Sequence, residues 1–200
     1  MRVIGGRLRG RRLPTGAKVE GLRPISGRIK QSLFDILKEV VGGARFLDLF
    51  AGTGAVGIEA LSRGAAFACF VELARRAVEN LERNLARAGL KDRSAALRGN
   101  ACDDLSWVPF RSKTAQYDLV FTGPPYKDLA GRPLAYTAAA LTRVMAADLL
   151  APGGWIICQH QVKEPVGAVP GLEMFRRVKY GDSYLSFFKA RPPAASGTPS

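Results

Sequence analysis

Two short stretches contain the residue types with which this chain could do chemistry. The stretch "DLFAGTGAVG" contains Gly52, Gly54 and Gly57, a spacing that satisfies G-x-G-x-x-G. That pattern places backbone N–H groups at the start of a helix, where nucleotide ligands bind. The stretch "GPPY", Gly123 to Tyr126, joins two prolines and an aromatic ring after a run with strand composition. Proline adds carbonyl acceptors without N–H donors, and tyrosine can stack on an extruded base, so the pair of stretches predicts a cofactor site beside a base site.

The glycine stretch alone does not choose between cofactors. Glu72 lies eighteen residues after Gly54 and could bind the vicinal ribose hydroxyls of NAD as well as those of S-adenosylmethionine. Asp48, just before the turn, favours S-adenosylmethionine, because a carboxylate there repels a pyrophosphate and attracts an ammonium and a sulfonium. The methionine carboxylate can still use the helix N-terminus. A carboxylate satisfied only by backbone amides is the structural alternative for Asp48.

The chemistry predicted for "GPPY" is methylation of an exocyclic base amine. Such an amine is a poor nucleophile, and an enzyme assists it by accepting hydrogen bonds from the NH2 group and holding it in line with the methyl group. Gly123 offers no acceptor side chain, so the carbonyls of Gly123 and Pro124, or the side chain of Asp128, are the candidates. We expect direct in-line transfer without a covalent intermediate, followed by loss of the amine proton to water.

Positive charge is concentrated at the N-terminus and points to a polyanionic partner. The chain has a formal net charge of +13, of which +8 belongs to the first thirty residues. Each Arg or Lys that faces a phosphate releases condensed counterions, so nucleic acid is the natural partner, with a merely solubilising surface as the alternative. The candidates for phosphate contacts are Arg7, Arg9, Arg11, Arg12, Arg23 and Arg28.

The elements that must position these residues alternate along the chain. Apolar periodicity predicts strands at 45–50, 66–72, 94–99, 117–122 and 155–159, and helices at 26–41, 55–64, 74–89 and 134–150. This alternation predicts an α/β fold with a doubly wound, mostly parallel sheet whose ligands bind at the carboxyl ends of the strands. Residues 173–180 and 183–190 flank the turn "GD" and predict an antiparallel hairpin at the sheet edge. Turn signals between short apolar runs predict a basic hairpin or arm at the N-terminus.

Six segments, in order and with few insertions, make a specific resemblance. They are "RVIGGRLRGRRL", "LRPISGRIKQSLFDIL", "FLDLFAGTGAVGIEALSRGA", "VEL", "GPPY" and "YGDSYLSFF", and they run from about Arg2 to Lys189. Together they resemble the RsmD-type methyltransferases, which methylate the N2 amine of a guanine in bacterial small-subunit ribosomal RNA. The resemblance implies a Rossmann-like sheet of seven strands, S-adenosylmethionine as methyl donor, and a basic N-terminal hairpin that helps to hold RNA.

The resemblance also implies roles for individual residues. The cofactor-binding set is Asp48, Phe50, Ala51, Gly52, Gly54, Glu72, Leu73, Asn100 and Ala101, with the last two near the adenine. The catalytic set is Gly123, Pro124, Pro125 and Tyr126, which face the guanine. The family usually has Asp or Asn at the position of Gly123. Loss of one preorganised acceptor costs about 3–4 kcal/mol, so we expect a working but slower enzyme.

This interpretation divides the chain into a basic RNA-binding arm (1–25), a methyltransferase domain (26–190) and a disordered tail (191–200). Three cysteines without CxxC spacing predict reduced thiols and a cytoplasmic protein. A single histidine and no Cys/His cluster argue against a metal site, and no apolar run approaches the length of a membrane span. The expected partner is small-subunit ribosomal RNA or the assembling 30S subunit, and we expect a monomer. An organellar transit peptide is a weaker interpretation of the N-terminus.

Three other functions remain open from the sequence. The chain could be a non-catalytic RNA-binding protein with a vestigial cofactor pocket. It could be an adenine-N6 DNA methyltransferase, although such enzymes usually carry an added recognition region. A nicotinamide-dependent oxidoreductase is the least favoured, because nothing resembles a hydride-transfer site, and His160 is expected to be a structural or pocket-rim residue.

Overall fold

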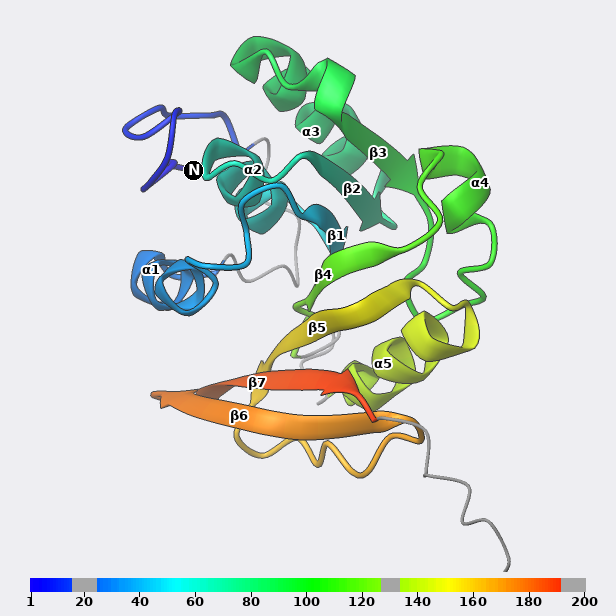
Figure 1. Ribbon diagram of the computed structural model, residues 1–200. Helices are drawn as coiled ribbons and strands as arrows, with labels where there is room; N and C mark the ends of the chain where they lie inside the picture. The colour runs from blue at the N-terminus through cyan, green and yellow to red at the C-terminus, as the bar shows by residue number, and fades with distance from the viewer. Residues whose placement is uncertain (16–24, 127–133, 192–200) are drawn as a thin grey trace, which may run out of the picture.

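The computed structural model describes residues 1–15, 25–126 and 134–191 (Figure 1). Within these ranges seven strands form one sheet in the order β3-β2-β1-β4-β5-β7-β6, which confirms the expected fold class. The strands are β1 (Arg45–Leu49), β2 (Phe67–Glu72), β3 (Ser94–Arg98), β4 (Tyr117–Thr122), β5 (Leu150–Gln161), β6 (Leu172–Tyr180) and β7 (Ser183–Ala190). Strands β1 to β5 are parallel, and β7 lies antiparallel between β5 and β6. The strand order reverses between β1 and β4, the switch point at which such sheets bind ligands.

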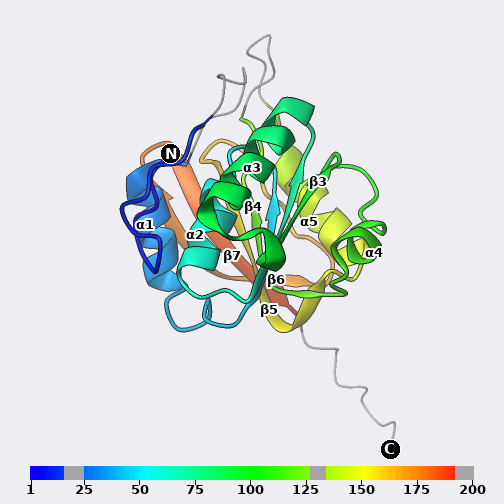
Figure 2. The ribbon, with the colours of Figure 1, turned by 90° about the horizontal axis from the view of Figure 1, so that it is seen from above.

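Helices cover both faces of the sheet, so each face has its own core. They are α1 (Gly27–Ile36), α2 (Ala55–Ser62), α3 (Arg75–Ala88), α4 (Val108–Ser112) and α5 (Tyr136–Ala146), with a 3-10 turn η1 (Lys91–Arg93). Seen from above, α1 and α2 lie on one side of the sheet, and α4 and α5 lie on the other (Figure 2). Alternate side chains of β1 point to opposite faces, so Phe46 joins the core under α1 to α3 and Leu47 joins the core under α4 and α5. No helix in the described ranges is long and apolar enough to cross a membrane.

Two helices are shorter than the sequence predicted. The helix expected over 26–41 ends at Ile36, because Leu37 has left helical geometry (ψ 1°) and residues 40 and 41 both donate to the Leu37 carbonyl. The helix expected over 134–150 ends at Ala146, two residues before Asp148 adopts a positive φ of 49°. A residue in the left-handed region stops a helix, and apolar periodicity alone does not reveal it.

Strand β5 starts earlier than predicted and contains a bulge. The strand expected from Trp155 begins at Leu150, and the stretch 151–154, which belonged to no predicted element, lies inside it. Tyr117 pairs with Leu150 and Leu119 pairs with Trp155, so the extra residues of β5 are accommodated between these two pairs. The short helix α4 was not predicted, because five residues carry too little periodicity.

The described part of the basic arm forms the expected hairpin. Arg2 and Arg12 form an antiparallel bridge, and the Val3 N–H donates to the Arg11 carbonyl at 3.0 Å. Val3 and Leu13 are buried in the core beneath α1 and α2. The arm therefore shares a core with the sheet instead of standing apart from it.

A buried carboxylate on α2, that of Glu59, holds the arm against the domain. Glu59 accepts hydrogen bonds from the backbone N–H groups of Ile4 at 3.0 Å and Gly5 at 2.7 Å. The Lys30 ammonium on α1 lies 2.9 Å from the same carboxylate and donates to the Arg2 carbonyl at 2.9 Å. Lys30 is buried, so this charge of the basic N-terminus serves folding and does not face solvent.

Replacing Glu59 tests this docking point. Glu59→Gln leaves the Lys30 ammonium buried without its counter-ion, and loss of one partner of a buried pair costs about 3–5 kcal/mol. We expect urea unfolding to show a loss in this range and trypsin to cleave the arm faster. Glu79→Gln is the matched control, because its ion pair with Arg75 is exposed and should contribute less than about 1 kcal/mol. Equal losses in the two variants would contradict the role assigned to Glu59.

Candidate active site

The turn between β1 and α2 lies at the switch point, and its backbone is held in unusual conformations. Phe50, Gly52 and Gly54 have positive φ angles of 57°, 52° and 74°. A positive φ is uncommon for phenylalanine, and such strain concentrates at functional sites. A Cβ at Gly54 or Gly57 would collide with neighbouring side chains, at 2.3 Å in each case. These two glycines therefore let α2 pack closely on the rest of the domain.

Two buried carboxylates hold this turn in place. Asp48 accepts a hydrogen bond from the Gly57 N–H at 2.9 Å. Glu72, at the end of the neighbouring strand β2, accepts from the Gly52 N–H and the Ala74 N–H, both at 2.8 Å. Asp48 is 2% exposed and has no cationic partner among the described residues. A buried carboxylate without a cation is suited to a positively charged ligand.

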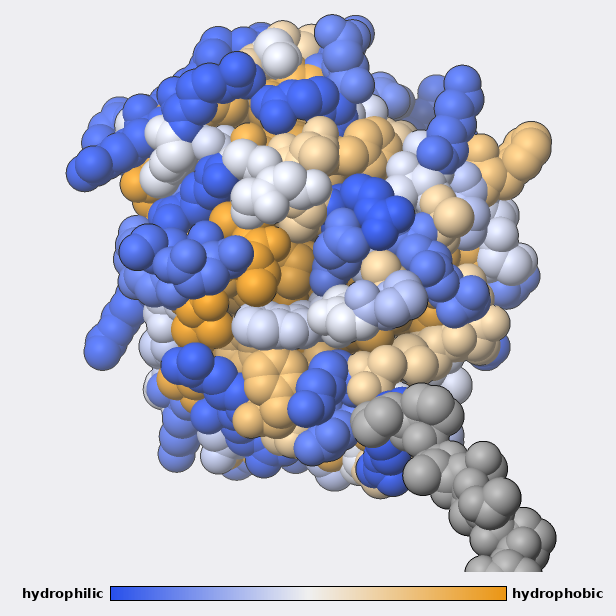
Figure 3. All heavy atoms as spheres, in the orientation of Figure 1, coloured by the Kyte–Doolittle hydropathy of each residue, from blue (hydrophilic) through white to orange (hydrophobic). Residues whose placement is uncertain are grey.

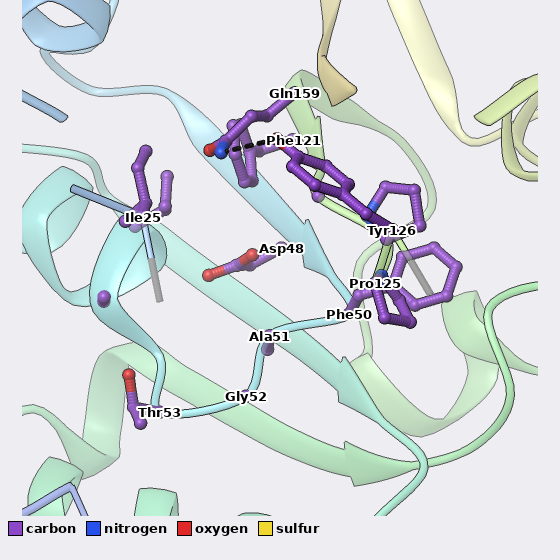
Figure 4. Close-up of a pocket in the computed structure, with 14 residues that line it drawn as sticks. Ile25, Asp48, Phe50, Ala51, Gly52, Thr53, Phe121, Pro125, Tyr126 and Gln159 are labelled. Carbon is purple, nitrogen blue, oxygen red and sulfur yellow. Dashed lines mark hydrogen bonds between the residues drawn. The ribbon is translucent and has the colours of Figure 1, made fainter. Parts of the chain in front are cut away.

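Two neighbouring cavities open at these strand ends, and Figure 4 shows the lining of the first. The first, of about 80 Å³, is lined by Asp48, Phe50, Ala51 and Gly52 and by all four residues from Gly123 to Tyr126. The second, of about 310 Å³, is lined by Phe50, Glu72, Leu73, Asn100 and Ala101. Phe50 and Pro125 belong to both linings, so the cavities adjoin. Gly54 is in neither lining, and its cofactor contact stays a prediction.

The fold thus brings the proline loop to the glycine turn, as the sequence predicted. The loop follows β4, and β4 pairs with β1, with Asp48 opposite Phe121. A Cβ at Gly123 would lie 3.1 Å from the Phe121 ring, a tight contact that a small shift of the ring would relieve. Asp128, the alternative acceptor, lies outside the described residues.

Tyr126 is held by its hydroxyl. Its Oη donates to Ser183 Oγ at 3.1 Å and accepts from Gln159 Nε2 at 3.0 Å. Figure 4 shows the ring reaching from the proline corner toward Gln159. These contacts fix the ring at the wall of the first cavity.

Burial changes the ionisation of Asp48. Removal from solvent raises its pKa to about 8, the Gly57 hydrogen bond opposes this rise, and the nearby Glu72 carboxylate adds to it. The raised pKa favours the protonated form of Asp48 near neutral pH. A ligand cation beside it would favour the charged carboxylate and displace that proton.

Gln159 and Tyr136 are among the cavity-lining residues that were not singled out from the sequence. Gln159 is 8% exposed and lines the first cavity. Tyr136 lines the second, and its ring stacks on Phe50 with centroids 6.5 Å apart and planes at 7°. Gln159 lies near the carboxyl end of β5, next to β4, so the rule for ligands in open sheets could have found it. Tyr136 carried no such signal.

His160, expected to be structural or at the pocket rim, is buried and hydrogen-bonded on both sides. Its Nδ1 lies 2.9 Å from the Gln161 carbonyl, and its Nε2 lies 2.9 Å from Ser186 Oγ. A carbonyl only accepts, so Nδ1 carries the proton and Nε2 accepts from the serine. Burial lowers the pKa of His160. Both nitrogens are thus occupied by the protein.

The arginines predicted to contact RNA come from the first thirty residues, and Figure 3 shows hydrophilic surface over the arm and α1. Those within the described residues are all exposed: Arg7, Arg9, Arg11, Arg12 and Arg28. Arg23 lies outside the described residues. Arg28 lines a further cavity, of about 310 Å³, which also includes Lys179 and Gln159 and so lies beside the first. Contact of these arginines with RNA stays a prediction.

Comparison with known proteins gives consistent matches. The family model described as "Conserved hypothetical protein 95" matches residues 1–189. The Bacillus subtilis (strain 168) protein YlbH, which has a provisional rRNA methyltransferase name, is 32% identical over 195 residues, covering 96% of this chain and 100% of the relative. Ribosomal RNA small subunit methyltransferase D of Escherichia coli (strain K12) is 40% identical over 129 residues, covering 64% of this chain and 61% of the relative. The solved structure of the Escherichia coli protein yhhF, provisionally titled a methyltransferase, has a TM-score of 0.77 and 29% identity over 95% of this chain and 97% of its own.

The sheet order, the glycine turn and the acidic residues at the ends of β1 and β2 define a Rossmann-like methyltransferase fold. More specifically, the chain belongs to the family of that model and of methyltransferase D, the RsmD-type methyltransferases. The family predicted from the sequence is confirmed.

The raised pKa of Asp48 predicts a pH-dependent stability of the ligand-free protein. Because its folded-state pKa lies above that of an unfolded chain, the folded state keeps a proton that the unfolded state loses between about pH 4 and about pH 8. Stability should therefore fall as pH rises through this window. Asp48→Asn removes the ionisation and can still accept from Gly57, so urea unfolding should show a smaller decrease in stability from pH 5 to pH 9. An unchanged decrease would exclude Asp48 as its source.

Proposed function

We propose that the protein transfers the methyl group of S-adenosylmethionine to the N2 amine of a guanine in bacterial small-subunit ribosomal RNA. The observation that carries this proposal is the cavity shared by Asp48, the glycine turn and the loop from Gly123 to Tyr126. A cationic donor and a flat acceptor base would meet there. The names of the ribosomal RNA methyltransferases to which the chain is similar support RNA as the substrate.

The two cavities suit the two ends of the proposed cofactor. Asp48 and the Gly52 backbone would hold the methionine end, where a buried carboxylate faces an ammonium and a sulfonium. Glu72 would accept from the ribose hydroxyls, and the cavity beside Asn100 and Ala101 would take the adenine. Phe50 stands where the cavities join. When bound, S-adenosylmethionine supplies a methyl group on a positively charged sulfur, and the sulfur is the leaving group when the amine lone pair attacks the methyl carbon in line.

The protein residues would orient the base and its amine. Tyr126 is fixed by two hydrogen bonds and can stack on the base, a contact that contributes about 1–3 kcal/mol. Pro124 and Pro125 supply carbonyls without competing N–H groups. The methylated amine loses its proton to water, so no residue has to act as a base.

A catalytically impaired homologue that binds cofactor and RNA is the second candidate. The observation that favours it is Gly123, which offers no acceptor side chain and where an added Cβ would lie only 3.1 Å from the Phe121 ring. Both candidates predict binding of the cofactor and of RNA, but only the main proposal predicts transfer of the methyl group.

Transfer of a labelled methyl group to RNA distinguishes these functions. We expect purified protein to place label on one guanine of small-subunit ribosomal RNA, recovered as N2-methylguanosine after digestion. Naked RNA and assembling subunits should be compared as substrates. Asp48→Asn should lower the affinity for S-adenosylmethionine, because the counter-charge is lost. Label in N6-methyladenosine would show that the target base is adenine and would contradict the proposal. Cofactor binding without any methyl transfer would favour the impaired homologue.

The basic arm should contribute a salt-dependent part of RNA binding. Arg9→Gln with Arg12→Gln removes two exposed charges, and the slope of log affinity against log salt should become shallower by about 1 to 2. Arg111→Gln with Lys113→Gln is the matched control, because it removes two exposed charges near α4, on the opposite face of the sheet. Filter binding over a range of salt concentrations measures both slopes. Identical slopes in the two double variants would exclude the arm as a specific RNA contact.

A further inference from the structure

Gln159 occupies the position next to Gly123 in the sheet. Strands β4 and β5 are parallel, and Thr122 pairs with Cys158. Gly123 and Gln159 each follow one residue later on these neighbouring strands. A Cβ at Gly123 would contact the Phe121 ring, and both Phe121 and Gln159 line the first cavity. The side chain of Gln159 therefore reaches the cavity into which a side chain at 123 would project.

A chain of hydrogen bonds fixes how the Gln159 carboxamide is turned. Asp182 is exposed, and a carboxylate accepts without donating, so Ser183 Oγ must donate to Asp182 Oδ1 at 3.2 Å. Ser183 has one hydroxyl proton, so it accepts from Tyr126 Oη at 3.1 Å. Tyr126 has then spent its own proton and must accept from Gln159 Nε2 at 3.0 Å. The amide nitrogen of Gln159 is thus directed at Tyr126.

The carboxamide oxygen is left facing away from Tyr126. Figure 4 shows it on the side of Gln159 remote from the tyrosine hydroxyl, toward Ile25. Within the described residues no group donates a hydrogen bond to this oxygen, although only 8% of Gln159 is exposed. An acceptor at the wall of this cavity that no described residue satisfies is suited to a ligand N–H.

We propose that the carboxamide oxygen of Gln159 accepts the hydrogen bond from the substrate amine for which Gly123 offers no side chain. This inference rests on the proposed function and deepens it. Gln159 holds one amine N–H so that the nitrogen lone pair points at the methyl group. The lone pair forms the new N–C bond, the S–C bond pair stays on sulfur, and the displaced amine proton goes to water. Gln159 itself forms no covalent bond.

The decisive experiment is a cycle of variants at positions 159 and 123. Gln159→Met keeps the length of the side chain and removes its oxygen. Single-turnover methyl transfer should fall by about 10² to 10³, with the affinity for S-adenosylmethionine unchanged. In a Gly123→Asn background, the same change should cost less than about tenfold, because the new amide supplies the acceptor. Gln31→Met, the same change at an exposed glutamine of α1, is the matched control and should leave the rate unchanged.

The direction of the hydrogen-bond chain has its own test. Ser183→Ala frees the Tyr126 hydroxyl to donate to Gln159, which allows the carboxamide to turn its NH2 group toward the amine. We expect slower transfer in this variant, relieved by Gly123→Asn. Ser106→Ala, at an exposed serine that lines neither cavity, is the control for the loss of a hydroxyl.

The outcomes separate this inference from the proposed function. Transfer by the wild-type chain with an equal loss from Gln159→Met in both backgrounds would show that Gln159 only supports Tyr126, and would overturn the inference. An unchanged rate in Gln159→Met would also overturn it while leaving the proposed function intact. Cofactor binding without transfer by the wild-type chain would overturn the proposed function and the inference together. Rescue by Gly123→Asn supports the role of the Gln159 oxygen.

Discussion

The site depends on two carboxylates buried at the ends of neighbouring strands. Asp48 and Glu72 accept backbone N–H groups from the glycine turn and from the residues that follow β2, and so hold the segment that enters α2. Burying two acidic groups side by side is unfavourable, as the raised pKa of Asp48 shows. A cationic ligand would favour the charged form of Asp48, so the same pair shapes the cavity and supplies its electrostatic preference.

A third buried carboxylate joins the basic arm to this arrangement. Glu59 lies on α2, the helix that begins at the glycine turn, and it binds both the arm backbone and Lys30 of α1. The arm that carries the exposed arginines is therefore attached to α2, the helix that follows the glycine turn. This connection gives a physical reason for the arm and the sheet to act as one body.

Much of the fold was accessible from the sequence because its signals are local. Apolar periodicity located the strands and helices, and the glycine spacing located the turn. The errors occurred where a non-local pairing or a single backbone angle decided the outcome. Asp148 stops α5 through a positive φ, and the bulge in β5 is defined by its partners in β4. The carboxyl-end rule located the site, but it did not identify Tyr136 as part of the wall.

The sequence by itself determined the residue types and their order: an acid before a glycine turn, a second acid one strand later, a proline corner with an aromatic ring, and a basic N-terminus. It also determined that position 123 has no acceptor side chain. Only the tertiary structure decided what stands beside that position. The parallel register of β4 and β5 places Gln159 next to Gly123. The hydroxyls of Tyr126 and Ser183 then turn the carboxamide oxygen of Gln159 away from Tyr126. Strand register and hydrogen-bond direction depend on residues that are far apart in the chain, so a local sequence pattern cannot predict either of them.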